Sequence, residues 1–126
     1  MKIDNFEDLN VYKQSRELTK EIYKLTRKPI FSQDRSLTNQ MRRASVSIMS
    51  NIAEGFERET TREFIRFLYI SKGSAGEIRV QIMVALDQAY ISEKLYAELL
   101  DRTRRIGGML SNLISYLKQS PYKKRR

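Results

Sequence analysis

The stretch Gln40–Phe56, with the sequence QMRRASVSIMSNIAEGF, decides the fold of this chain. Its spacing predicts most of one long helix with two neighbouring apolar seams. The first seam is spaced 4, 3, 4 and consists of Met41, Ser45, Ile48 and Ile52. The second is spaced 3, 4, 3 and consists of Val46, Met49, Ala53 and Phe56. A small bundle supplies neighbours for only one seam, so the stretch predicts a bundle that assembles with copies of itself.

Three further helices are expected around this one, over residues 6–27, 61–89 and 92–118. Asp34 or Ser36 is expected to cap the central helix, which runs to about residue 57, and Pro29 ends the helix before it. Short connections between long helices predict an all-α, antiparallel, up-down-up-down four-helix bundle. We expect one domain over residues 1–120, followed by a basic, mobile tail over residues 121–126.

The helix expected over residues 61–89 also has two seams, and the segment Gly73-Ser74-Ala75-Gly76 lies in its middle. Each glycine in a helix costs about 1 kcal/mol relative to alanine, so we expect it to allow another backbone to come close. The small residues Ala44, Ser45 and Ser47 are the expected partners, and a kink is the alternative. The two outer seams together predict an oligomer interface of Val46, Met49, Ala53, Phe56, Tyr69, Gly76, Val80 and Met83.

Composition excludes several kinds of chemistry. The 126 residues contain no cysteine and no histidine, which removes thiol nucleophiles, thiolate zinc sites and the commonest general base. No nucleotide-binding glycine motif is present, so we expect no catalytic residues, no metal and no cofactor. Glu54 could form a carboxylate pair with Glu57 or with Glu77. We expect Glu54 and Glu57 to be solvated instead, and Glu77 to form a structural ion pair with an arginine. No membrane span or signal peptide is apparent, which predicts a cytoplasmic protein.

The formal charge of +9 favours a polyanionic partner, RNA or DNA, although an ordinary excess of lysine and arginine is the alternative. No base-reading motif accompanies the charge, so binding would be through phosphates and sensitive to salt. The candidate contacts are Arg42, Arg43, Lys72, Arg79, Lys123, Lys124, Arg125 and Arg126.

Several blocks of residues carry a family resemblance. Gln40–Ile48, Asn51–Gly55 and Gly73–Glu77, with Phe6–Leu9 and Phe64, resemble the four helix bundle protein family, also called 23S rRNA-intervening sequence proteins. The resemblance covers about residues 6–118. It implies antiparallel bundles that form homopentamers, without established catalysis, related to the nucleic-acid-binding accessory protein of diversity-generating retroelements.

We therefore expect a non-enzymatic homopentamer with a basic surface that binds RNA or DNA. The alternative is a protein-interaction scaffold, or an accessory subunit of another protein, without nucleic-acid binding. One simple experiment distinguishes these two interpretations: a labelled RNA should bind at low salt only if the first is right.

Overall fold

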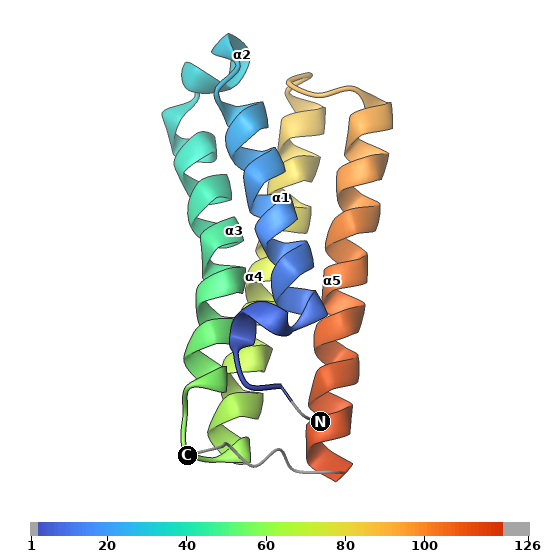
Figure 1. Cartoon of the computed structure of the whole chain (residues 1–126). Helices are drawn as coiled ribbons and strands as arrows, with labels where there is room; N and C mark the ends of the chain where they lie inside the picture. Colours follow the sequence, from blue (N-terminus) through green and yellow to red (C-terminus); the bar gives the residue numbers. More distant parts are fainter. Residues whose placement is uncertain (1–2, 120–126) are drawn as a thin grey trace.

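The computed structural model describes residues 3–119, and every regular element in them is a helix. A 3-10 turn, η1, spans Phe6–Asp8, and a short helix, α2, spans Pro29–Ser32. The four long helices run side by side and antiparallel (Figure 1). They are α1 (Asn10–Thr26), α3 (Arg35–Phe56), α4 (Thr61–Asp87) and α5 (Glu93–Gln119). The predicted all-α four-helix bundle is confirmed.

Polar caps set the starts of three long helices. The side chain of Asp34 accepts a hydrogen bond from the backbone N–H of Leu37, and Thr60 accepts one from Glu63. Ser92 accepts one from the N–H of Leu95 in the same way. Each bond satisfies a backbone donor that the first turn of a helix leaves without a partner. Asp34 is one of the two caps expected for the central helix, whereas η1, which lies within the helix expected over residues 6–27, and the short helix α2 were not predicted.

The helices follow each other around the bundle in the order α1, α3, α4, α5. α3 packs between α1 and α4, while α5 packs on α4 and less extensively on α1. Within residues 3–119, α1 and α4 do not pack on each other, so these two helices lie diagonally across the bundle. Their outer faces therefore point away from each other.

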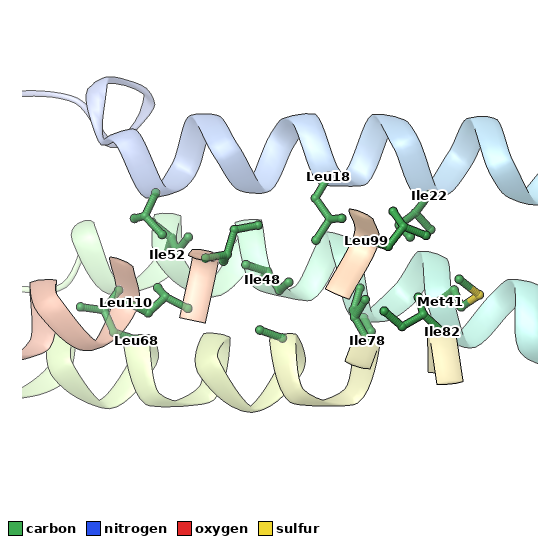
Figure 2. Close-up of a cluster of buried hydrophobic side chains, with 14 of the residues drawn as sticks. Leu18, Ile22, Met41, Ile48, Ile52, Leu68, Ile78, Ile82, Leu99 and Leu110 are labelled. Atoms are coloured by element: carbon green, nitrogen blue, oxygen red, sulfur yellow. The ribbon is translucent and has the colours of Figure 1, made fainter. Parts of the chain in front are cut away.

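The inner seam of α3 forms the centre of the core. Met41, Ile48 and Ile52 are fully buried, and Figure 2 shows them among apolar side chains from the other three long helices. These neighbours include Leu18, Ile22, Leu68, Ile78, Ile82, Leu99 and Leu110. Each such side chain contributes about 1.5–3 kcal/mol when it leaves water, so this seam supplies much of the stability of a single subunit.

The segment Gly73-Ser74-Ala75-Gly76 does not interrupt α4, so the kink considered as an alternative is absent. Ser74 and Ala75 point inward, and the Ser74 hydroxyl lies 2.8 Å from the Ser47 hydroxyl. The glycines point the other way, because a Cβ on Gly73 would meet nothing within 4 Å. The close contact expected between α3 and this segment is therefore formed by Ser74, and both glycines face away from α3.

Candidate nucleic-acid interface

The outer face of α1 carries a row of five exposed cations. The row is spaced 3, 4, 4, 3 and consists of Lys13, Arg16, Lys20, Lys24 and Arg27. The inner face of the same helix is apolar, with Val11, Leu18 and Ile22 buried in the core. Because a helix rises about 1.5 Å per residue, the basic row extends about 21 Å along the bundle. We call these five residues the basic row.

The basic row is largely free of neutralising acids. Among the described ion pairs, only Lys20 of the row takes part, with Glu17 at 3.0 Å. Both side chains of that pair are more than half exposed, so the attraction is weak and screened by salt. The row therefore presents a positive field to solvent along one side of the molecule.

Arg42 extends the positive surface from α3 towards α1. Its Nε donates a hydrogen bond to Thr26 Oγ1 at 2.8 Å, and its guanidinium carbon lies 4.6 Å from the centroid of the Tyr23 ring. Stacking and hydrogen bonding fix the side chain at the α1–α3 seam. Its half-buried position holds the cation close to the C-terminal end of α1, where positive charge is favoured.

A groove runs along the α1–α3 seam beside the basic row. One part of it, of about 340 Å³, is lined by Arg16, Thr19, Lys20, Tyr23, Arg27 and Met49, with no acid among them. The adjoining part, of about 440 Å³, is mainly apolar and is lined by Phe6, Tyr12, Thr19, Tyr23, Val46, Met49, Ser50 and Ala53. We call the two parts together the α1–α3 groove. Its floor is apolar and its α1 edge is basic.

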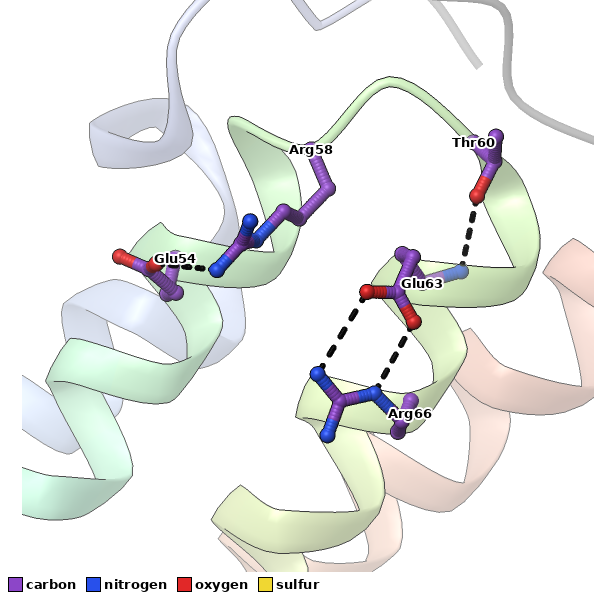
Figure 3. A network of polar contacts seen from close by, with 5 residues as sticks. All are labelled: Glu54, Arg58, Thr60, Glu63 and Arg66. Carbon is purple, nitrogen blue, oxygen red and sulfur yellow. Dashed lines mark hydrogen bonds and ion pairs between the residues drawn. The ribbon is translucent and has the colours of Figure 1, made fainter.

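Arginines at the opposite end of the bundle are paired with acids instead. Figure 3 shows Arg58 bound to Glu54 at 2.7 Å and Arg66 bound to Glu63 through two nitrogens, at 2.9 and 3.4 Å. The hydrogen bond from Arg66 and its charge lower the pKa of the Glu63 carboxyl. Both guanidinium groups also lie over the ring of Phe67. These arginines stabilise the α3–α4 turn and are poor candidates for phosphate contacts.

The candidates chosen from the sequence do not form one cluster. Arg43 is exposed about 100° further round α3 than Arg42. Lys72 is exposed on α4, and Arg79 lies between α4 and α5, with a guanidinium nitrogen 3.8 Å from where a Cβ of Gly107 would be. Residues 123–126 lie outside the described part of the chain. The structure therefore separates this set into at least two places.

Sequence reasoning missed the basic row, because it treated the outer side of the first helix as an ordinary solvated face. The signal was available in the spacing. Five cations recur at intervals of three or four residues from position 13 to position 27, and the two intervening acids, Glu17 and Glu21, fall to one edge of that row. The common face of the cations follows from helix geometry, whereas the approach of Arg42 depends on tertiary packing.

A second unusual surface lies on α4, where the outer face is apolar. Val80 is 60% exposed, Tyr69 and Met83 are each 48% exposed, and Ile70 and Val84 are also exposed. Gly73 and Gly76 lie among them and add no side chain. We call these seven residues the α4 outer face. Large apolar groups gathered on one exposed face mark an interaction surface more often than a free one.

The structure changes the predicted oligomer interface at one position. Phe56 was placed on the outer seam of the central helix, but it is only 2% exposed and packs edge-on against Phe64, with ring centroids 5.9 Å apart. The helix ends at this residue, and the N-terminal segment brings Phe6 over it. Val46, Tyr69, Val80 and Met83 remain exposed, while Met49, Ala53 and Gly76 are half-buried.

Within residues 3–119, no group of three potential metal-ligating acids comes together. No helix of that part is both long and apolar enough to cross a bilayer. A groove of about 620 Å³ separates α1 from α5, but its lining mixes acids and arginines, and Asp101 and Arg105 there pair at 3.0 Å. The basic row and the α4 outer face are therefore the two surfaces that require an explanation.

Comparison with known proteins agrees with this architecture. A family model described as 23S rRNA-intervening sequence protein matches residues 7–112. A crystal structure of a protein of unknown function from the S23 ribosomal protein family of Bacteroides thetaiotaomicron VPI-5482 superposes with a TM-score of 0.76. It is 24% identical, and the match covers 82% of this chain and 97% of that chain, which shows a shared fold. No curated protein matches the chain.

Proposed function

The chain belongs to the 23S rRNA-intervening sequence protein family, and we propose that it is a non-enzymatic, self-assembling bundle that binds RNA or DNA through phosphates. The observation that carries the proposal is the basic row, in which five exposed cations follow one side of α1 and, among the described ion pairs, only Lys20 is paired, weakly, with Glu17. Phosphate backbones are bound by such rows without base recognition. We propose a cytoplasmic location for this activity.

The proposed contacts are the basic row first, followed by the exposed Arg43 of α3. Arg42 has its guanidinium committed to Tyr23 and Thr26, so we assign it mainly to holding the seam. Lys72, Arg79 and residues 123–126 remain secondary candidates, because a long nucleic acid can follow positive charge beyond one helix. Repetition of the row in an oligomer would strengthen binding through avidity.

Self-assembly is proposed from the α4 outer face. Val80 alone leaves 60% of its surface in water, and four other large apolar side chains surround it. Burying this surface against further copies would recover about 25 cal/mol for each Å² removed from water. A homopentamer is the subunit number that we propose, and light scattering at micromolar concentration should then give five times the 14.9 kDa subunit mass.

Salt titration with matched variants tests nucleic-acid binding. The triple variant Lys13→Gln, Lys20→Gln, Lys24→Gln changes the basic row, and Lys94→Gln, Arg104→Gln, Arg105→Gln removes the same charge from α5. A fluorescein-labelled single-stranded RNA should bind the wild type with a slope of log K against log salt of about −0.7 for each phosphate engaged. The α1 variant should lose about two units of that slope, and the α5 variant should keep it.

Equal losses in the two variants would mean that net charge, and not the row, attracts the RNA. Absence of binding by the wild type at about 50 mM salt would favour the second candidate, a scaffold for another protein. The α4 outer face is the specific observation behind that candidate, since exposed apolar faces also bind partner chains.

A further inference from the structure

The seam between α1 and α5 is packed less closely than the other seams between neighbouring long helices. It contains the groove of about 620 Å³ described above, which we call the α1–α5 groove. The acids in its lining make this groove unsuitable for phosphate, but they suit a cation. We infer that the α1–α5 groove is a docking site for a basic, amphipathic helix of another protein. This inference depends neither on nucleic-acid binding nor on self-assembly.

The floor of the α1–α5 groove is apolar. Leu99 and Ile106 are buried in the core and line the groove from α5. Leu95 and Met109 are half-buried and extend this lining in both directions along α5. The four side chains share one side of α5, because their spacings of 4, 7 and 3 residues follow the helical repeat. A partner helix with apolar residues at spacings of three and four would pack on this floor as a bundle helix does.

The groove is elongated. Its lining runs from Asn10 to Glu21 along α1 and from Leu95 to Met109 along α5. With a rise of about 1.5 Å per residue, these two walls are about 16 and 21 Å long. That is the length of a helix of about 11–14 residues. A recess between two helical walls is the shape that a further helix fills, whereas a compact small molecule would occupy only part of it.

The charges of the lining favour a cationic partner. Three acids and two arginines line the groove, although the whole chain carries a formal charge of +9. Asp101 and Arg105 neutralise each other at 3.0 Å. Glu21 and Glu98 take part in none of the described ion pairs. Because α1 and α5 run antiparallel (Figure 1), these two acids lie towards the same end of the groove, where they would hold a lysine or arginine of the partner.

Arg102 adds a second requirement. It is half-buried in the groove, one turn along α5 from Glu98, and it forms no ion pair or hydrogen bond among the described interactions. A guanidinium group carries five N–H donors, which need acceptors when water is removed. A carboxylate or amide oxygen on the partner helix, about one turn beyond its cation, would supply one. The groove therefore selects a cation and an acceptor at helical spacing.

A helix in this groove leaves the basic row uncovered. Gln14 and Glu21 line the α1–α5 groove, whereas Arg16, Lys20 and Arg27 line the groove on the other flank of α1. The two flanks of α1 thus differ in charge. A basic partner is repelled from the basic flank, and a phosphate backbone is repelled from the acidic flank. One subunit can therefore hold a nucleic acid and a protein helix on opposite sides of α1.

Peptide selection tests the inference with a defined probe. A phage-displayed library of helical peptides of about 14 residues is selected on the wild-type protein. Enriched sequences should have apolar residues at spacings of three and four, with lysine or arginine towards one end. The net charge of +9 would by itself attract acidic peptides, so enrichment of basic ones requires local acids. Enrichment of acidic peptides, or of none, would overturn the inference.

Matched charge reversals locate the bound peptide, which is synthesised with a fluorescein label and measured by anisotropy. The double variant Glu21→Lys, Glu98→Lys should weaken its binding by about tenfold or more. The control Glu7→Lys, Asp87→Lys reverses two exposed acids outside the groove and should change binding little. A peptide with glutamate in place of its basic residues should bind the first variant better than the wild type. Equal weakening by the two variants, or no such exchange of preference, would overturn the inference.

Two further measurements separate docking from self-assembly. The variant Glu21→Lys, Glu98→Lys should keep the helical circular dichroism and the assembled mass of the wild type, because the α4 outer face is unchanged. Loss of that mass would show that another copy of this chain fills the groove. Met109→Gln, in the floor, should also weaken the peptide, whereas Met83→Gln, on the α4 outer face, should not. Weakening by Met83→Gln alone would place the peptide on α4 and overturn the assignment to the groove.

Discussion

Gly55 of α3 lies so close to Phe67 of α4 that a Cβ atom on Gly55 would be 2.8 Å from the Phe67 Cβ. The backbone oxygen of Phe64 would also lie only 3.1 Å from it. Gly55→Ala should therefore destabilise the subunit by about 1–3 kcal/mol through overpacking. Urea unfolding at a fixed subunit concentration measures this change, with the slope m expected to stay constant.

Gly108→Ala is the matched control for that measurement. Gly108 is also in a helix, but a Cβ there would meet nothing within 4 Å. The control should stabilise the protein by about 0.5–1 kcal/mol, because alanine is the better helix former. Equal stability changes at the two glycines would show that α3 and α4 separate easily at Gly55.

Gly55 also illustrates what the sequence could and could not show. The four long helices, the cap at Asp34 and the inner seam around Ile48 followed from local spacing and capping chemistry. The helical pattern marked Gly55 only as a stop, because the closeness of α4 depends on how two helices cross. Such contacts join residues of different helices, which local spacing does not relate to each other.

The same limit applies to the candidate surfaces. Spacing alone placed Phe56 on the outer seam of α3, but the N-terminal segment returns over it and buries it. Spacing also grouped Arg42 with Arg43, whereas the structure turns Arg42 onto Tyr23. The basic row is the reverse case, since the spacing of the cations within α1 is enough to place them on one face. Local periodicity therefore identifies faces, and tertiary packing decides which faces stay exposed.

Arg42→Ala should destabilise the subunit by about 1–2 kcal/mol. It removes the guanidinium from the Tyr23 ring, worth about 0.5–1 kcal/mol at an exposed site, and a hydrogen bond to Thr26 of similar value. Arg43→Ala is the control and should change the free energy of unfolding by less than about 0.5 kcal/mol, since Arg43 is exposed. Thermal unfolding of both variants gives the comparison. Equal destabilisation would remove the assignment of Arg42 to the seam.

Tyr90 should make stability fall at alkaline pH. Its hydroxyl donates a hydrogen bond to the Asp34 carboxylate at 3.0 Å, and this bond, with burial and the negative charge, raises the pKa of the phenol above 10.0. A group whose pKa is raised on folding stabilises the protein fully below its unfolded pKa and loses that contribution as pH rises through the folded pKa. The melting temperature of wild type minus that of Tyr90→Phe should therefore be constant below about pH 10 and shrink above it.

Tyr69 is the matched contrast, because its phenol is shifted in the other direction. Lys118 donates a hydrogen bond to the Tyr69 oxygen at 3.0 Å, and this bond and the ammonium charge lower the pKa of the phenol. Its contribution should thus grow as pH rises through the folded pKa and persist at higher pH. Tyr69→Phe and Tyr90→Phe should therefore diverge in opposite senses in the same pH series, and parallel curves would contradict both assignments.

Gly76→Leu distinguishes packing inside the subunit from packing between subunits. The sequence alone predicts that this change disrupts the assembly or the fold by overpacking, and within the subunit a Cβ on Gly76 would meet only the Arg79 guanidinium, at 3.8 Å. The variant should therefore unfold like the wild type in dilute solution, where subunits are separate. At concentrations where the wild type assembles, a leucine on the α4 outer face should hold neighbouring helices apart and lower the assembled mass. Gly108→Leu, on a helix outside the proposed contact, should leave that mass unchanged. A loss of melting temperature that does not depend on concentration would show that Gly76 is packed within its own subunit after all.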